Sequence, residues 1–260
     1  MRKLILVVVA ASSFFSIQAS AESENLSNWL VDGDGLWSYN DESNSWYQGK
    51  NTAYSTFLYD PSSAALGKAI TGQIEIDQNG DDDNIGFALG YEAGDATNSN
   101  ADYWLVSWRA GAQGSWNSGL SLWHVTGALN SYDLEDPVNH PALEFVAEGE
   151  TLGQTKWETG VDYTFDVTYN TDSLGVFVQD QLQFGFTAQD VGVESFEEGG
   201  FAFFNFSQDK VNYKNVQYDD IKNVLSEDKQ EQLAKSVPVQ FGYFGFAVLA
   251  FLGAFKRKKK

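Results

Sequence analysis

Between Trp29 and Tyr218, apolar and polar residues alternate in short runs separated by Gly, Asn and Asp. Side chains two residues apart on a strand share a face, so this alternation predicts strands with one buried side. Turn residues such as Asn170-Thr171-Asp172 and Gly199-Gly200 separate the runs. In each of four runs, we expect the alternating apolar side chains to share one face of the strand: Ile85, Phe87, Leu89 and Tyr91; Trp104, Val106 and Trp108; Tyr163, Phe165, Val167 and Tyr169; Leu182, Phe184 and Phe186. The pattern predicts an all-β antiparallel sandwich or barrel.

Two segments depart from this pattern. Val125 to Glu158 is less regular, and its stretch Asp136 to Pro141 indicates a loop. Asp219 to Ser236 is rich in charged and amide side chains, with only a partial helical stripe of apolar residues. We expect this second segment to be a solvated helical stalk, and a flexible linker is the equal alternative.

The N-terminal segment is typical of a secretory signal peptide. Arg2 and Lys3 precede an apolar run from Leu4 to Ala11, and Ala19-Ser20-Ala21 provides small residues for cleavage. An uncleaved membrane anchor is the alternative, but the apolar run is short for a hydrocarbon layer of about 30 Å. We therefore expect cleavage after Ala21.

The C-terminal segment predicts a transmembrane helix. Val237 to Phe255 carries no charge, and five basic residues, Lys256 to Lys260, close the chain. These nineteen residues would span about 28 Å as a helix, which is enough to cross a bilayer. The basic residues are expected on the cytoplasmic side. A buried core helix is the alternative, but five terminal cations disfavour it.

Composition limits the possible functions. The 260 residues carry a net charge of −20, and 36 Asp and Glu face only nine Lys and Arg between the two terminal segments. That surplus of negative charge excludes a nucleic-acid partner, which needs a basic surface. It suits an exterior rich in cations, and also a simple acidic surface. The chain has no cysteine, so neither disulfides nor thiolate chemistry contribute.

The densest group of candidate metal ligands lies between two predicted strands. Short oxygen-bearing side chains crowd eight residues that contain no Lys or Arg, and Ca²⁺ accepts six to eight such oxygens in flexible geometry. A solvated acidic turn is the alternative. We expect Ca²⁺ to be held by Asp77, Asn79, Asp81, Asp82, Asp83 and Asn84, with the last two best placed beside the following strand. A second candidate, Asp32-Gly33-Asp34-Gly35, indicates either an ion site or a tight turn.

Catalysis has weaker support. Glu75 and Asp77 are two residues apart, as in a glucanase signature Glu-x-Asp-x-x-Glu, but Gly80 stands where the third carboxylate belongs. We therefore expect no enzymatic activity. His124 lies in a strand-like run and is expected to be structural. Five aromatic residues in or beside Gly-, Ser- and Asn-rich segments suggest sugar stacking, although packing in the core is favoured for each: Trp37, Trp46, Tyr47, Trp116 and Trp123.

The order of motifs resembles the thrombospondin C-terminal domain. The resemblance covers about residues 29 to 218 and rests on DDDNIGFALGY, YWLVSWR, GLSLWHVTG, YTFDVTYNTDSLGVFV and GGFAFFNFSQDKVNYKNVQY, which begin at Asp81, Tyr103, Gly119, Tyr163 and Gly199. It implies a concanavalin-like jelly-roll sandwich that binds Ca²⁺ and acts in extracellular adhesion. The chain lacks the preceding Asp-rich repeats and the cysteines of that family, so no particular matrix partner is implied.

The C-terminal segment resembles PEP-CTERM sorting signals, which combine a short Val-Pro motif, one spanning helix and a basic end. Here the motif is Val237-Pro238-Val239-Gln240, without the usual Glu-Pro. The resemblance implies an exosortase-type processing enzyme as a partner. Cleavage would release the protein from the membrane, and its absence would leave a tail anchor.

Together these patterns predict four parts: a signal peptide at 1–21, a β-sandwich at 22–218, a charged stalk at 219–236 and a membrane or sorting tail at 237–260. The expected function is an exported, cell-surface, Ca²⁺-binding adhesion module without catalysis. A carbohydrate-binding lectin-like domain or a degenerate glucanase is the alternative. The glycan or protein ligand is not identified by any motif.

Overall fold

The computed structural model describes residues 23–62, 64–77, 80–112, 116–129, 133–221 and 225–236. The predicted signal peptide and the predicted C-terminal tail therefore lie outside the described residues. No helix among the residues described here has the length and apolar character needed to cross a bilayer.

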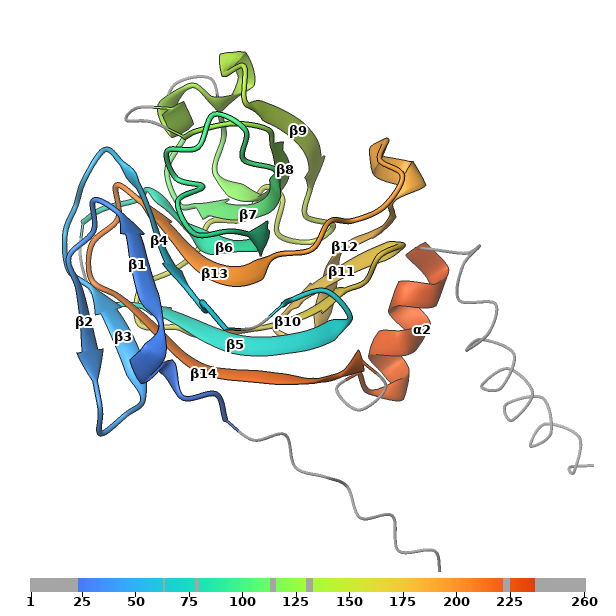
Figure 1. The fold of residues 1–260 in the computed structure, drawn as a ribbon, viewed down its shortest axis with the longest axis horizontal. Helices are drawn as coiled ribbons and strands as arrows, with labels where there is room; N and C mark the ends of the chain where they lie inside the picture. Colours follow the sequence, from blue (N-terminus) through green and yellow to red (C-terminus); the bar gives the residue numbers. More distant parts are fainter. Residues whose placement is uncertain are drawn as a thin grey trace, which may run out of the picture.

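The described chain folds into two seven-stranded antiparallel sheets that stack face to face (Figure 1). The first sheet contains, in spatial order, β1 (Leu30–Gly33), β4 (Ser55–Tyr59), β13 (Gly200–Phe206), β6 (Asn84–Tyr91), β7 (Tyr103–Arg109), β8 (Gly119–Val125) and β9 (Leu143–Glu148). The second contains β12 (Gln181–Thr187), β11 (Ser173–Val178), β10 (Asp162–Tyr169), β5 (Lys68–Ile76), β14 (Val211–Asp220), β3 (Ser45–Gln48) and β2 (Trp37–Asn40). This arrangement confirms the predicted all-β sandwich.

Short helical segments connect or flank the strands. They are the 3-10 turns η1 (Leu26–Asn28), η2 (Asp133–Glu135), η3 (Pro137–Asn139) and η4 (Gln189–Val191), and the helix α2 (Glu227–Ser236). The irregular segment predicted between Val125 and Glu158 contains η2 and η3 but also the edge strand β9. The sequence did not indicate that strand, because most of its side chains are exposed or half-buried.

The main core lies between the sheets and is rich in aromatic rings. Phe87 from the first sheet stacks on Phe165 from the second, with ring centroids 4.7 Å apart. The ring centroid of Phe201, on the first sheet, lies 5.7 Å from that of Phe165. Burial of large rings supplies most of the stability in such a core, and no disulfide is available to add to it.

Two of the predicted shared faces are broken by β-bulges. Tyr91 was expected beside Leu89, but Gly90 is the extra residue between the pairs Leu89–Phe201 and Tyr91–Gly200, so Tyr91 turns to the outer side. Gly90 has a φ of +78°, which glycine adopts without strain. In the same way Gln183 is extra on β12, and Leu182 faces away from the main core. The faces predicted for Trp104 to Trp108 and for Tyr163 to Tyr169 are confirmed.

The outer face of the first sheet is also buried. A second apolar cluster covers it, formed by strand residues such as Phe57, Leu105 and Phe204. Ala96 and Ala101 from the β6–β7 connection, and Leu129 and Leu134 from the β8–β9 connection, pack onto these side chains. Strands β6 and β7 are consequently buried along their whole length.

The segment expected to be a solvated stalk instead packs on the sandwich. Helix α2 lies beside β11 and β12 (Figure 1), and its Leu233 is buried against Phe177 and Leu182. Glycines make this approach possible, since a Cβ at Gly175 would come within 2.9 Å of Leu233. Lys229 forms ion pairs of 2.6 Å with Asp166 and 2.7 Å with Asp180. The partial apolar stripe is sufficient for docking because it meets Phe177 and Leu182, which face outward at the β11–β12 bulge.

We expect Leu233→Ala to lower the free energy of unfolding by about 2–4 kcal/mol, because it leaves a cavity beside Phe177 and Leu182. Urea unfolding followed by tryptophan fluorescence measures this effect. Glu231→Ala, in an exposed position of the same helix, is the control and should change stability by about 0.5 kcal/mol or less. Equal stability of both variants and the wild type would contradict the docking of α2.

Candidate functional site

The acidic turn between β5 and β6 brings three carboxylates together. One oxygen each from Asp81, Asp82 and Asp83 lies within 4.8 Å of the others. Asp77 is not in this group, and its carboxylate accepts a 3.4 Å hydrogen bond from Asn212. Asn84 begins β6, and its amide oxygen accepts a 3.0 Å hydrogen bond from Ser107. Asn79 lies outside the described residues.

Neighbouring turns hold the acidic turn in place. The Asn51 amide donates a 2.6 Å hydrogen bond to the Asp81 carboxylate, and the Asp83 backbone N–H donates to the Gln208 side chain at 3.1 Å. The buried indole of Trp157 donates to the Asp83 carbonyl at 3.1 Å. The Asp82 carbonyl accepts the backbone N–H of Gly111 at 2.7 Å. These bonds hold the backbone of the acidic turn at Asp82 and Asp83, and the bond from Asn51 orients the Asp81 carboxylate.

Close backbone approach adds to this constraint. A Cβ at Gly111 would lie 1.9 Å from the Asp82 carboxylate, so that carboxylate rests directly on the backbone just after β7. The β13–β14 turn, which contacts Asp83 through Gln208, has Ser207 at φ +55° and Lys210 at φ +59°. Non-glycine residues in this left-handed region are uncommon and tend to occur at functional sites.

A buried arginine partly compensates the negative charge of the acidic turn. The local sequence did not indicate this cation, because residues 77–84 contain no Lys or Arg. Arg109 is 1% exposed and pairs in register with Asn84 across β6 and β7. Burial lowers the pKa of Arg109, while the neighbouring charges of Asp83, Asp82 and Glu135 act to raise it. Its guanidinium remains charged at all physiological pH values. One guanidinium beside three carboxylates still leaves a surplus of negative charge.

Asp83 is the residue most changed by this environment. Its side chain is 6% exposed, and among the described residues its Oδ1 has no hydrogen-bond partner. Burial raises its pKa to about 6, opposed by a hydrogen bond from Ser207 and by Arg109, while Asp81 and Asp82 raise it further. The pKa of Asp81 is also raised, by burial and by the charge of Asp209.

The donor set fits a hard divalent cation. Carboxylate oxygens are the ligands that Ca²⁺ prefers, and an unpartnered buried carboxylate oxygen is costly unless something pairs with it. Asp83 Oδ1 is such an atom, and Asp81 and Asp82 lie beside it. The sequence therefore indicated the three carboxylates that the turn brings together, but gave no role to the supporting residues Asn51, Arg109, Ser207, Gln208 and Asp209. Arg109, Ser207, Gln208 and Asp209 lie within the family-like motifs, whereas Asn51 lies outside all of them.

The second acidic candidate is engaged by the protein itself. Asp32 accepts hydrogen bonds of 2.7 Å from the Tyr91 hydroxyl and 2.9 Å from the Gly94 N–H. Asp34 forms a 2.7 Å ion pair with Lys50. Asp32 thus ties the β6–β7 connection to β1, which supports the interpretation as a structural turn.

The residues considered for catalysis are likewise occupied. Glu75 forms a 2.7 Å ion pair with Lys214, which also pairs with Asp162 at 2.7 Å. His124 stacks on Trp104 with ring centroids 4.4 Å apart and contacts Asp102 at 2.7 Å. Nothing in these contacts forms a nucleophile–base pair of the kind used in hydrolysis.

The tryptophans considered for sugar stacking pack against other apolar side chains, as the sequence favoured. Trp123 is 2% exposed, and Trp37 and Trp46 pack against the main core while remaining partly accessible. Trp116 packs on Trp123 and on Phe145, with ring centroids 4.8 and 4.9 Å away. Phe145 is 43% exposed, so this group reaches the surface at the β9 edge.

Comparison with known proteins supports the fold alone. No protein-family profile and no curated protein sequence matches the chain. Among solved structures, the carbohydrate-binding module CBM66 from Bacillus subtilis is similar with a TM-score of 0.53 and 13% identity, over 75% of this chain and 97% of that one. A Bacillus subtilis protein of unknown function with a galectin-like fold follows, with a TM-score of 0.49 and 11% identity over 75% and 90%. The metal-free carbohydrate recognition domain of Emp46p has a TM-score of 0.46 and 16% identity over 75% and 89%.

The raised pKa of Asp83 predicts the pH dependence of stability without metal. Its folded-state pKa of about 6 lies above the unfolded value near 3.9, so ionisation destabilises the folded protein as pH rises from about 4 to about 6. Asp83→Asn removes this loss. Relative to wild type, the variant should therefore gain up to about 3 kcal/mol as pH rises through this window.

Urea unfolding in EDTA between about pH 5 and pH 7.5, above the isoelectric point near 4.2, should capture about half of this difference, about 1.4 kcal/mol. Asp41→Asn, on the exposed β2–β3 turn, is the control and should follow the wild-type profile. Parallel profiles for wild type and Asp83→Asn would show that the Asp83 carboxylate is not buried as described.

Proposed function

We propose that this protein is an exported, non-enzymatic binding module whose acidic turn holds Ca²⁺ through Asp81, Asp82 and Asp83. The observation that carries the proposal is the buried Asp83 Oδ1, which lacks a hydrogen-bond partner among the described residues and lies beside two further carboxylates. A divalent cation would offset the charge that Arg109 leaves uncompensated.

Calcium suits this site better than a softer metal. No histidine or cysteine belongs to the cluster, and hard oxygen ligands disfavour zinc and copper. The remaining coordination positions would be filled by backbone oxygens or water, as Ca²⁺ allows. The chemistry supplied is electrostatic, since the ion would hold the acidic turn against the β13–β14 turn and the end of β7.

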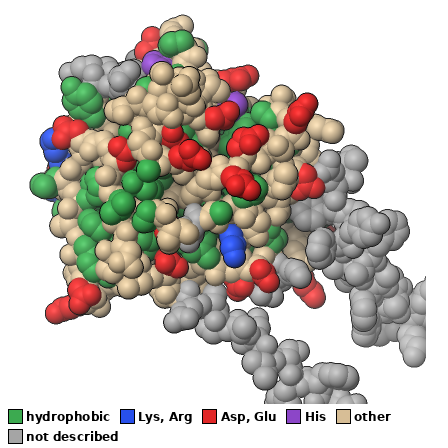
Figure 2. Space-filling view, in the orientation of Figure 1, with side chains coloured by type: hydrophobic (Ala, Val, Ile, Leu, Met, Phe, Trp, Pro, Cys, Tyr) green, Lys and Arg blue, Asp and Glu red, His purple; other side chains and the backbone are tan. Residues whose placement is uncertain are grey.

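Location and attachment are part of the same proposal. The predicted signal peptide and the acidic surface fit a protein that works outside the cell. On the face shown in Figure 2, Asp and Glu side chains are spread widely, with few Lys or Arg among them. The thrombospondin-like motif order supports adhesion. The predicted tail supports a membrane anchor or release by an exosortase-type enzyme.

A carbohydrate ligand is the second candidate. CBM66 is described as a carbohydrate-binding module, and this chain shares its fold. Fold similarity at 13% identity transfers no ligand, so the support must come from surface chemistry. The partly exposed rings of Trp116 and Phe145 offer one such surface, because sugar rings stack on aromatic faces.

Calcium should raise the melting temperature of the protein. At a Ca²⁺ concentration 100 times Kd, binding stabilises the folded state by about 2.7 kcal/mol, which corresponds to about 5–10 °C for a domain of this size. Differential scanning fluorimetry and isothermal titration calorimetry measure the shift and the binding. Asp82→Asn should abolish both, while Asp41→Asn should retain them. No heat of binding below about 1 mM Ca²⁺ would refute the metal site.

Adhesion and sugar binding are separated by a bead assay. Beads coated with the purified protein should aggregate in Ca²⁺, disperse in EDTA and fail to aggregate when coated with Asp82→Asn. Aggregation that free oligosaccharides abolish would favour the lectin-like alternative. Beads that remain dispersed in Ca²⁺ would contradict adhesion through self-association.

A further inference from the structure

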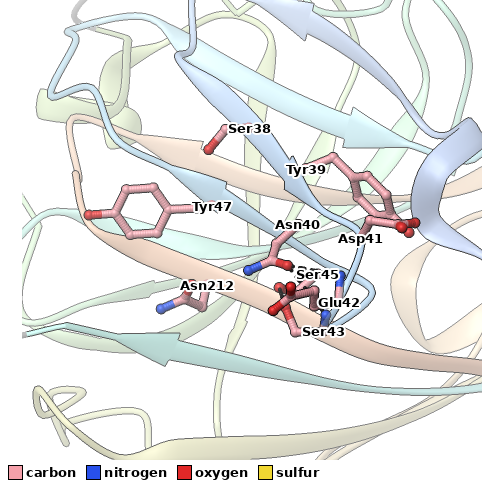
Figure 3. A pocket seen from close by; sticks show the side chains of 9 residues that line it. All are labelled: Ser38, Tyr39, Asn40, Asp41, Glu42, Ser43, Ser45, Tyr47 and Asn212. Carbon is pink, nitrogen blue, oxygen red and sulfur yellow. Dashed lines mark hydrogen bonds between the residues drawn. The ribbon is translucent and has the colours of Figure 1, made fainter.

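A hollow of about 650 Å³ opens beside the β2–β3 hairpin (Figure 3). Trp46, Val211 and Tyr213 point into the main core, so their neighbours Tyr47 and Asn212 face outward into this hollow. Its lining contains hydroxyl and amide side chains, one pair of tyrosines and two acidic residues at the turn: Ser38, Tyr39, Asn40, Asp41, Glu42, Ser43, Ser45, Tyr47 and Asn212.

The strands arrange three of these side chains in one row. Ser38 pairs in register with Tyr47, and Tyr47 pairs with Asn212. Adjacent strands lie about 4.8 Å apart, so the row offers a hydroxyl, an aromatic ring with a hydroxyl, and an amide over about 10 Å. That spacing suits a ligand carrying several hydroxyl groups along its length.

The hairpin wall of the hollow is preorganised. The Asn40 side chain accepts the backbone N–H of Glu42 at 3.0 Å, and the hydroxyls of Ser43 and Ser45 are 2.8 Å apart. The Asn44 amide donates to the Glu24 carbonyl at 2.7 Å, which ties the turn to the N-terminal segment. A wall fixed in advance lowers the entropy cost of binding.

The charges around the hollow favour an uncharged ligand. None of the nine lining residues is Lys, Arg or His. The nearby Lys214 is paired with both Glu75 and Asp162, so its charge is already compensated. Anionic ligands would meet the carboxylates of Asp41 and Glu42 without a cation to offset them.

Tyr47 also connects the hollow with the acidic turn. Burial raises the pKa of its hydroxyl, and the charges of Asp77 and Asp209 raise it further, so the hydroxyl stays protonated and able to donate. Asp209 also acts on Asp81. Asn212, which lines the hollow, also donates a 3.4 Å hydrogen bond to Asp77 just after β5, so the two sites lie at the same end of the sandwich.

We propose that this hollow binds a neutral saccharide, with Ser38, Asn40 and Asn212 bonding its hydroxyl groups and the Tyr47 ring packing against a sugar face. Pockets that bind such ligands combine aromatic side chains with a few fixed polar groups. This inference rests on the proposed function as a binding module, but not on the metal site.

The test uses the full purified chain and a panel of uncharged oligosaccharides from β-glucan, α-glucan, mannan, galactan and xylan, with polygalacturonate as an anionic probe. Wild type should bind at least one neutral glycan with a Kd below about 1 mM in calorimetry, and polygalacturonate more weakly. Asn212→Ala and Tyr47→Ala should each weaken this binding about tenfold or more. Absence of binding to every neutral glycan would refute the proposal.

Ser38→Trp keeps the test decisive if the Tyr47 variant misfolds, because exposed Ser38 lies on the edge strand β2 and a Trp there fills the hollow. Its matched control is Gln181→Trp, at an exposed position of the opposite edge strand β12. Binding lost only in Ser38→Trp supports the hollow, and binding unchanged in it overturns the assignment.

Calcium titrations separate this proposal from the proposed metal site. Ca²⁺ binding retained in Ser38→Trp, together with loss of the glycan, supports two separate sites. Glycan binding in EDTA by a protein that takes up no Ca²⁺ would refute the metal site alone. Ca²⁺ binding by a wild type that binds no neutral glycan would refute the hollow alone.

Discussion

Burial of the first sheet on both of its faces determines where charge is placed in this protein. Strands β6 and β7 are covered by the second sheet on one side and by two connections on the other. Arg109, at the end of β7, is therefore held away from water, and the neighbouring charges of Asp82, Asp83 and Glu135 stabilise its guanidinium there. The acidic turn supplies carboxylates beside that end of β7. Burial of the central strands thus explains why charged side chains gather where these strands end.

The fold class could be predicted from alternation alone, but the facing of individual residues could not. Trp104 to Trp108 and Tyr163 to Tyr169 keep a strict period of two and point where expected. Tyr91 and Leu182 each follow one extra residue, at Gly90 and Gln183, and point the other way. A bulge depends on the register with a partner strand, which sequence alternation does not contain. The same limit explains α2, whose weak apolar stripe matches a surface created by a bulge 50 residues away.

The candidate site shows a similar division. The local sequence indicated Asp81, Asp82 and Asp83, because three consecutive residues in a turn are necessarily close in space. The contributions of Asn51, Arg109 and Gln208 arise from pairing between distant segments and left no local signal. The predicted ligand Asn84 is oriented instead by Ser107 on the neighbouring strand. The sequence could not predict the β2–β3 hollow for the same reason. Ser38, Tyr47 and Asn212 are aligned by the register between three strands, and the sequence does not contain that register.

The docking of α2 has a mechanical consequence. The chain leaves β14 in the middle of the second sheet and returns over β11 and β12 before continuing past residue 236. Tension applied along the chain beyond that point reaches α2 first and must detach Leu233 and Lys229 before it loads β14. The helix would then detach first under tension, while the sandwich keeps its fold.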